Sequence, residues 1–215
     1  RVAAATRVAV GRAPHPVHVP SVGRETSIDK TATAEPVAVG LLGLEGDIQA
    51  DKKHHGGPDK ALYAYAEHEA EEWARRLGRP VPPGLFGEIL RVAGVETSAA
   101  IIGETWRIGD DVVVEATMPR TPCATFADRM REPRWVRRFG EAGLVGTYLR
   151  VLQTGTLRAG DPIELVSRPE HGVTVASWFT DPTAVSASVL LDAHESGAVR
   201  LADHMVDKVT GFAVR

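Results

Sequence analysis

The 215-residue sequence contains a single cysteine, Cys123. One cysteine excludes an intramolecular disulfide framework and fits a reducing compartment. No apolar run approaches the roughly 20 residues that span a bilayer, and the N-terminal stretch lacks the charged, apolar and small-residue order of a signal peptide. The start at Arg1 rather than Met leaves a processed precursor open. We therefore expect a soluble cytoplasmic protein.

The sequence also has little net charge. Its formal charge is −3 at pH 7, with 25% charged and 43% hydrophobic residues, which is an ordinary globular balance. General nucleic-acid or anionic-membrane binding requires broad basic surfaces, so neither is expected, and any anion site must be local. The length suits one large domain, or one domain with a small appendage.

The cysteine lies in an unusual segment, Met118–Thr125. Pro119 and Pro122 each restrict φ and remove a backbone donor, which predicts a stiff loop rather than the continuation of a central strand. Arg120 lies three residues before the cysteine, and a nearby cation favours the thiolate, which attacks electrophiles and binds soft metals. Buried free cysteines also act as small hydrophobes, so both interpretations stay open here.

A second polar segment, residues 43–60, contains four glycines and few apolar residues. Long polar loops in compact domains tend to be functional or disordered. In this segment Gly56 and Gly57 would let backbone N–H groups approach a ligand, with His55 beside them and Lys60 as a point charge. Adjacent His54 and His55 suggest zinc only weakly, because neighbouring side chains project in different directions in regular structure.

Two further regions carry residue types that bind anions. Residues 14–34 are expected to form a loop whose small, hydroxyl and cationic residues include Ser27 and Lys30, a mix that can cradle phosphate. An ordinary solvated loop is the favoured interpretation of that stretch by itself. After Cys123, two short predicted helices have basic faces that are either solvated or steer an anion; their arginines include Arg129, Arg131, Arg134, Arg137 and Arg138.

The hydrophobic pattern predicts many short strands and few helices. Glu67–Leu77 is the clearest helix, ended by Gly78, and a hairpin is expected around Gly109. The fold class is mainly β with α (α+β), as a β-barrel or strongly bent sheet with peripheral helices. Strands are predicted at residues 2–10, 36–42, 61–66, 101–108, 112–117, 144–153 and 162–166.

The chain changes character after Arg168. Residues 173–179 are apolar, and residues 182–194 and 197–209 have helical patterns, while strand patterns stop. We therefore predict a barrel domain at residues 1–168 and a helical C-terminal extension at 169–215, which packs on the barrel or on a partner chain.

Five blocks occur in the order typical of one family, across roughly residues 20 to 170. Together they closely resemble MOSC domains, the C-terminal domain family of molybdenum cofactor sulfurases, and within it the stand-alone bacterial YiiM-like subgroup. The blocks are Gly46-Asp47-Ile48-Gln49-Ala50-Asp51, His55-Gly56-Gly57-Pro58-Asp59-Lys60-Ala61-Leu62-Tyr63-Ala64-Tyr65, Pro83-Gly84-Leu85-Phe86-Gly87-Glu88, Pro119-Arg120-Thr121-Pro122-Cys123 and Tyr148-Leu149-Arg150-Val151-Leu152.

The resemblance implies a MOSC-type β-barrel core and a molybdenum cofactor (molybdopterin) whose metal is bound by Cys123. A soft thiolate suits that metal. Two positions depart from the family pattern: Ile89 follows Glu88 where relatives usually have asparagine, and Thr125 stands where many have lysine. The candidate cofactor-binding residues are Arg120, Lys60, Lys30, His55, Gly56, Gly57, Ser27 and Arg129.

The function that the resemblance implies is the reduction of N-hydroxylated compounds, such as N-hydroxylated bases, amidoximes and hydroxylamines. An external redox protein would supply two electrons, and Glu88, Asp47 and His55 are candidate proton donors. A homodimer is a further expectation. Two alternatives stay open: sulfur transfer through a Cys123 persulfide or the cofactor's sulfur, and a non-catalytic carrier of the cofactor, which the departures at Ile89 and Thr125 motivate.

Overall fold

The computed structural model describes residues 8–12, 17–19, 24–48 and 56–213. An eight-stranded sheet forms the centre, in the order β13-β9-β10-β11-β7-β8-β1-β4, and β7 with β8 is the only parallel pair among the described strands. Two small sheets, β12-β5-β6 and β2-β3, complete the strands. The strands are β1 Val8–Arg12, β2 Val17–Val19, β3 Arg24–Thr26, β4 Thr31–Thr33, β5 Val37–Gly40, β6 Gly43–Leu44, β7 Leu62–Ala66, β8 Leu90–Val92, β9 Thr105–Ile108, β10 Val112–Pro119, β11 Thr147–Gln153, β12 Gly155–Leu157 and β13 Ile163–Ser167.

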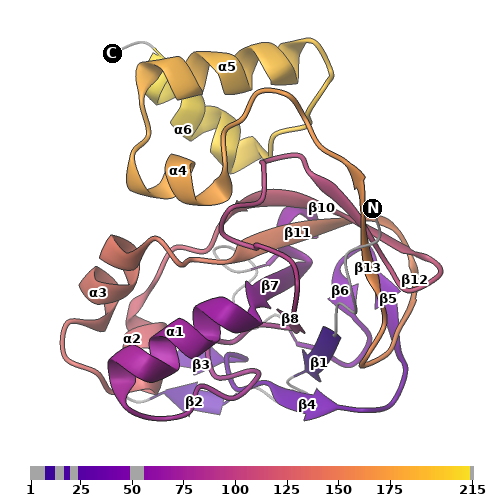
Figure 1. Cartoon of the computed structure of the whole chain (residues 1–215), viewed down its shortest axis with the longest axis vertical. Helices are drawn as coiled ribbons and strands as arrows, with labels where there is room; N and C mark the ends of the chain where they lie inside the picture. Colours follow the sequence, from indigo (N-terminus) through magenta and orange to yellow (C-terminus); the bar gives the residue numbers. More distant parts are fainter. Residues whose placement is uncertain (1–7, 13–16, 20–23, 49–55, 214–215) are drawn as a thin grey trace.

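The predicted mixed class is confirmed: strands surround a common core and helices lie outside them (Figure 1). The hairpin around Gly109 is also confirmed, because β9 and β10 pair across it. The expected loop at residues 14–34 is wrong in detail, since the described part contains β2, β3 and β4. Short strands with mixed polar and apolar residues carry too weak an alternation to be recognised from the sequence.

The proline-rich segment begins later than predicted. Strand β10 continues through Met118 to Pro119, which pairs with Thr147 of β11. The other neighbour, β9, pairs with β10 only as far as Glu115. One side of the strand end therefore has no partner strand among the described residues, and a proline without an N–H is tolerated there.

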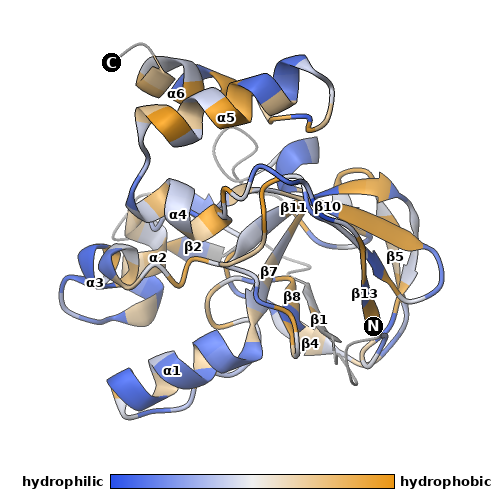
Figure 2. Ribbon diagram, turned by 45° about the horizontal axis from the view of Figure 1, so that its top comes forward, coloured by the Kyte–Doolittle hydropathy of each residue, from blue (hydrophilic) through white to orange (hydrophobic). Residues whose placement is uncertain are grey.

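Three helices lie beside the sheet: α1 Glu67–Leu77, α2 Ala124–Met130 and α3 Trp135–Ala142. Helix α1 has the predicted bounds and ends at Gly78 in the left-handed conformation. Its ribbon is mostly hydrophilic in Figure 2, and its apolar face is buried through Ala70 and Trp73. Trp73 stacks on Phe139 of α3 at a centroid distance of 5.6 Å, so α1 and α3 share one aromatic core.

The tail forms three helices, α4 Val175–Thr180, α5 Ala184–Glu195 and α6 Asp203–Ala213, which group at one end of the molecule near β10 and β11 (Figure 1). Thr174 and Thr183 cap α4 and α5 with reciprocal side-chain bonds. The tail also bonds to the sheet region, since Val175 N donates to Ala100 O at 2.9 Å. Buried tail residues belong to the same hydrophobic cluster as the strands. The division at residue 168 stays a prediction, but the extension packs on the core of its own chain.

In the described part of the chain, no helix is both long enough and apolar enough to cross a membrane.

Candidate functional site

Cys123 lies at the junction between the loop after β10 and helix α2. It is the residue that precedes α2, with an extended backbone (φ −131°, ψ 173°), and its side chain is half-buried against the hydrophobic core. As the only cysteine of the chain, it cannot form an internal disulfide. The thiol is thus neither sealed in the interior nor fully exposed.

Arg120 is the buried cation of this segment. It is only 4% exposed, and its guanidinium carbon lies 3.9 Å from the Phe126 ring centroid and 5.6 Å from that of Tyr63. One terminal nitrogen, Nη1, is buried and has no hydrogen-bond partner among the described residues. A buried guanidinium with an unused donor is costly unless an acceptor reaches it. Arg120 therefore favours an anionic or carbonyl-bearing ligand.

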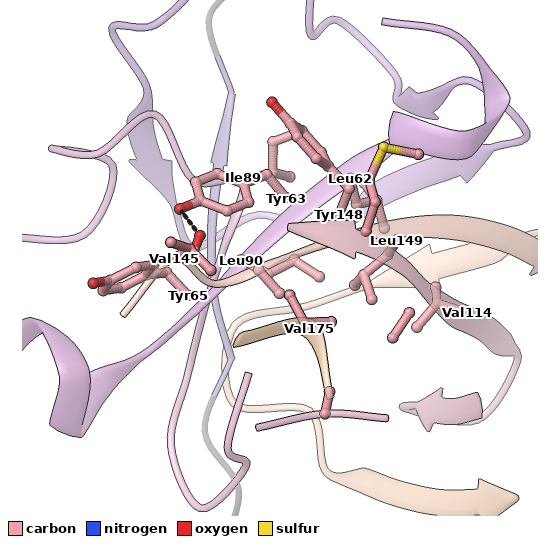
Figure 3. Close-up of a cluster of buried hydrophobic side chains, with 14 of the residues drawn as sticks. Leu62, Tyr63, Tyr65, Ile89, Leu90, Val114, Val145, Tyr148, Leu149 and Val175 are labelled. Atoms are coloured by element: carbon pink, nitrogen blue, oxygen red, sulfur yellow. Dashed lines mark hydrogen bonds between the residues drawn. The ribbon is translucent and has the colours of Figure 1, made fainter. Parts of the chain in front are cut away.

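Tyr63 lies beside Arg120, and Tyr148 lies beside Tyr63. Tyr63 donates its hydroxyl hydrogen bond to Val145 O at 2.9 Å, shown dashed in Figure 3, and its ring lies 5.3 Å from that of Tyr148. Burial raises the pKa of Tyr63 well above its ordinary value, although Arg120 opposes this shift. Tyr63 therefore remains a neutral phenol, and its bond to Val145 fixes the ring against which the arginine packs.

Lys30 and Asp47 form a buried ion pair, with Nζ and Oδ1 2.5 Å apart. Burial lowers the pKa of Lys30, and Asp47 acts in the opposite direction. Both residues are half-buried as a whole, but their side chains are only 7% and 4% exposed. Each side chain largely neutralises the charge of the other. This pairing does not favour Asp47 as a proton donor or Lys30 as an available cation, and the sequence did not reveal it because the two residues are 17 positions apart.

The Glu88 side chain is buried, and its carboxylate bonds to other residues of the protein. Its Oε1 accepts from Gly84 N at 2.9 Å, its Oε2 accepts from Phe86 N at 3.0 Å, and Arg91 forms an ion pair with the same carboxylate. The carboxylate is fully buried, and its contacts join the loop at residues 83–88 to Arg91 of β8. The expectation that Glu88 donates a proton to substrate stays a prediction, and these contacts do not favour it, because both oxygens accept backbone N–H bonds.

That loop packs closely on the segment that contains Ser27 and Lys30. Gly84 has φ +86°, and a Cβ there would lie 2.5 Å from Lys30 O, which only glycine avoids. Ser27 is buried, and its hydroxyl has no hydrogen-bond partner among the described residues. Arg129 joins the two segments, since its Nε donates to Leu85 O at 2.8 Å and it pairs with Asp29 at 2.8 Å. Ser27 thus adds a second buried polar atom available to a ligand.

The glycine loop consists of Gly56, Gly57 and the three residues that follow them. Gly56 and Gly57 are half-buried; Gly57 has φ +92° and open space where a Cβ would be. The short helix η1 Pro58–Lys60 follows, and Lys60 Nζ lies 5.8 Å from the Tyr148 ring centroid. His55, predicted as both a cofactor contact and a proton donor, lies outside the described residues together with His54. Among the residues that are described, no cluster of three or more metal-ligating side chains occurs.

Two cavities flank the cysteine segment. A polar cavity of about 660 Å³ is lined after the cysteine by Thr125 and Arg129 and, from the Ser27 segment, by Thr26 and Ile28. An apolar cavity of about 320 Å³ is lined before the cysteine by Met118, Pro119 and Thr121, and on its other side by the tail helices. Cys123 is therefore two residues from a lining residue of each cavity, Thr121 on one side and Thr125 on the other.

The two positions that depart from the family pattern have contrasting environments. Ile89 is buried in the hydrophobic core, and its N–H donates to Tyr63 O at 2.9 Å. Thr125 is buried and lines the polar cavity. The first departure adds apolar packing beneath Tyr63, whereas the second leaves a hydroxyl in the polar cavity where a cation is usual in the family.

Comparison with known proteins identifies the family. The sequence model of the MOSC domain matches residues 51–164, more than half of the chain. The chain belongs to the MOSC domain family. Protein YflK of Bacillus subtilis is 38% identical over 151 residues, which cover 70% of this chain and 68% of YflK. Protein YiiM of Escherichia coli is 34% identical over 150 residues, which cover 68% of this chain and 66% of YiiM.

Solved structures agree with this assignment. The crystal structure of YiiM from Geobacillus stearothermophilus superimposes with a TM-score of 0.75 at 26% identity, over 94% of this chain and 96% of that one.

A protein of Gibberella moniliformis named Reductase is 34% identical over 139 residues, which cover 62% of this chain but only 24% of the fungal protein. Membership of a family associated with the molybdenum cofactor is thus supported, together with a YiiM-like fold.

Sequence reasoning missed two groups of residues at this site. Arg150 was part of a family block but had no role assigned to it, and in the structure it bonds to Asp59 of the glycine loop at 2.7 Å. His204 and Lys208 come from the tail and line the apolar cavity. Only the packing of α6 against the cysteine segment brings them there, so no local pattern could have indicated them.

Proposed function

We propose that this protein is a molybdenum-cofactor-dependent reductase of N-hydroxylated compounds, with Cys123 as the metal ligand. The observation that carries the proposal is the buried, unpartnered Nη1 of Arg120, three residues before the only thiol. A cation with one unused donor, three residues from a soft ligand, fits a group that contains both a metal and anionic or carbonyl oxygens. The Ser27 hydroxyl is a second unused donor for such a group.

The roles of the residues follow from their contacts. Cys123 would hold the metal, while Arg120 and Ser27 would bind the organic part of the cofactor. Arg129 lines the polar cavity and would add a further cation for the cofactor. Its partner Asp29 has a side chain that is 57% exposed, so water screens this ion pair and Arg129 can exchange Asp29 for a ligand at little cost. Gly56 and Gly57 would offer backbone donors, and Lys60 adds a positive charge on the side of Tyr148.

When bound, the molybdenum cofactor supplies the two-electron chemistry that removes oxygen from an N–O group. The chain must deliver protons so that the oxygen leaves as water. Asp47 and Glu88 are engaged in ion pairs, so His55 remains the proton donor of the proposal. An external redox protein as electron donor and a homodimeric state also remain predictions.

The test measures molybdenum and pterin in full-length protein isolated from a cofactor-competent host. Wild type, Cys123→Ser and Arg120→Gln are compared with Arg137→Gln, which alters an exposed arginine of α3 paired with Glu141. We expect wild type and Arg137→Gln to contain metal and to reduce benzamidoxime, Cys123→Ser to lose the activity, and Arg120→Gln to lose pterin together with metal.

Four outcomes would contradict the proposal. Wild type without molybdenum, or Cys123→Ser with full activity, would remove the metal–thiolate role. A mass increase of one sulfur on Cys123 without bound metal would instead support sulfur transfer, and tight pterin binding without turnover would support a carrier.

A further inference from the structure

The apolar cavity is built jointly by the cysteine segment and the C-terminal helices. Met118, Pro119 and Thr121 form one wall, and Trp178, Met205 and Phe212 belong to the other. The rings of Trp178 and Phe212 meet edge to face, with centroids 5.6 Å apart and planes at 71°. A volume of about 320 Å³ lies within the range of small-molecule pockets. A flat apolar ring suits walls of this kind.

The polar side chains that line the cavity are neutral or basic, and each of them can donate a hydrogen bond. They are Thr121, His204 and Lys208, and none of the described residues that line the cavity is acidic. Lys60 also acts on His204: burial is the main cause that lowers the pKa of this histidine, Lys208 and Lys60 lower it further, and Asp207 and Asp59 oppose them. An occupant therefore gains from acceptor atoms, and a cationic occupant meets Lys208 in the lining, whereas the carboxylates of Asp207 and Asp59 lie outside it.

Arg150 connects the tail segment before α6 to the glycine loop. Arg150 of β11 donates to Asp59 at 2.7 Å and to the carbonyl of Arg200 at 3.1 Å, so one buried guanidinium bonds to both segments. Arg200 lies three residues before Asp203, the first residue of α6, and Asp59 precedes Lys60. The cavity is therefore a fixed feature of the fold rather than a gap beside a loosely attached appendage.

We propose that this cavity is the substrate pocket, and that the C-terminal helices select neutral, flat, apolar N-hydroxylated compounds over cationic ones. The inference rests on the proposed function. Phe212 and Trp178 would contact the ring, and Lys208 would exclude a positively charged substituent. The selecting groups thus come from the tail, while the cofactor-binding groups come from the residues before it.

The test compares substrates of different shape and charge on full-length enzyme loaded with cofactor. Benzamidoxime supplies a neutral ring, its para-aminomethyl derivative adds a cation, and hydroxylamine has no ring. Phe212→Ala should lower kcat/KM for benzamidoxime about tenfold, mainly through KM, and leave hydroxylamine unchanged. Lys208→Glu should raise the relative use of the cationic derivative, whereas Thr210→Glu, on the same helix but outside the cavity, should not.

A second measurement does not depend on turnover. Benzamide, a neutral compound without an N–O bond, is titrated into the protein without cofactor and followed by tryptophan fluorescence, because Trp178 lines the cavity. Binding that weakens in Phe212→Ala supports the pocket. Suppose that wild type reduces the substrates but neither variant changes the ratios of kcat/KM between them or the binding of benzamide. The substrate-pocket proposal then fails, while the proposed function stands. If wild type reduces no N-hydroxylated compound yet binds benzamide in this cavity, the proposed function fails and the ring-binding cavity stands.

Discussion

Replacement of Arg150 by methionine tests the network that joins the sheet, the glycine loop and the tail. The Arg150 side chain is 5% exposed and forms ion pairs with Asp59 and Glu115, both at 2.7 Å, besides its bond to Arg200 O. Methionine preserves much of the volume but leaves two largely buried carboxylates without their cation. Breaking a buried pair in this way costs about 3–5 kcal/mol. For a chain of this size the melting temperature should fall by about 6–20 °C.

The assay is urea denaturation followed by circular dichroism, with the free energy of unfolding extrapolated to zero denaturant. Arg107→Met is the matched control, because Arg107 pairs with Glu164 at 2.8 Å while both side chains are more than 40% exposed. That pair should contribute less than about 1 kcal/mol. In the Arg150→Met background, Glu115→Gln should recover part of the loss, since it removes one uncompensated charge.

The same variant has a pH signature. Burial raises the pKa of Glu115, and Arg150 opposes that shift, so removal of Arg150 raises the pKa further. Glu115 then becomes protonated at a higher pH in the folded variant than in the unfolded chain, and the stability deficit should shrink as the pH falls through this window. A loss below about 1 kcal/mol that equals the Arg107→Met control and does not vary with pH would refute the network.

Two further predictions concern the loop contacts and the cavity. Gly84→Ala should cost about 1–3 kcal/mol of unfolding free energy, and more than Gly172→Ala, because both have positive φ but only a Cβ at Gly84 meets the Lys30 backbone; equal losses in denaturation would contradict this contact. His204 has a pKa lowered mainly by burial, so the unfolded chain takes up its proton first and wild-type stability should fall as the pH drops below about 6.5. His204→Asn should lack this component in thermal melts across pH 5 to 8, and an unchanged pH dependence would show that the partial burial of His204 does not affect stability.

Local patterns were sufficient for much of the fold. Helix α1 has the predicted bounds because its apolar spacing, its charged outer face and Gly78 all act within one segment. The hairpin around Gly109 was equally local. The motif that contains Cys123 also identified the family from the sequence, because the order of short blocks along the chain is itself the signal.

The partners of the polar residues were decided only by tertiary structure. Lys30 with Asp47, Glu88 with Gly84 and Phe86, and Arg150 with the tail satisfy one another across segments that no periodicity relates. Charge and residue type are properties of the sequence, but the energy of a buried ion depends on which group lies opposite it after folding. For the same reason the sequence could indicate Arg120 as a cation, whereas only the packed structure leaves one of its donors buried and unused.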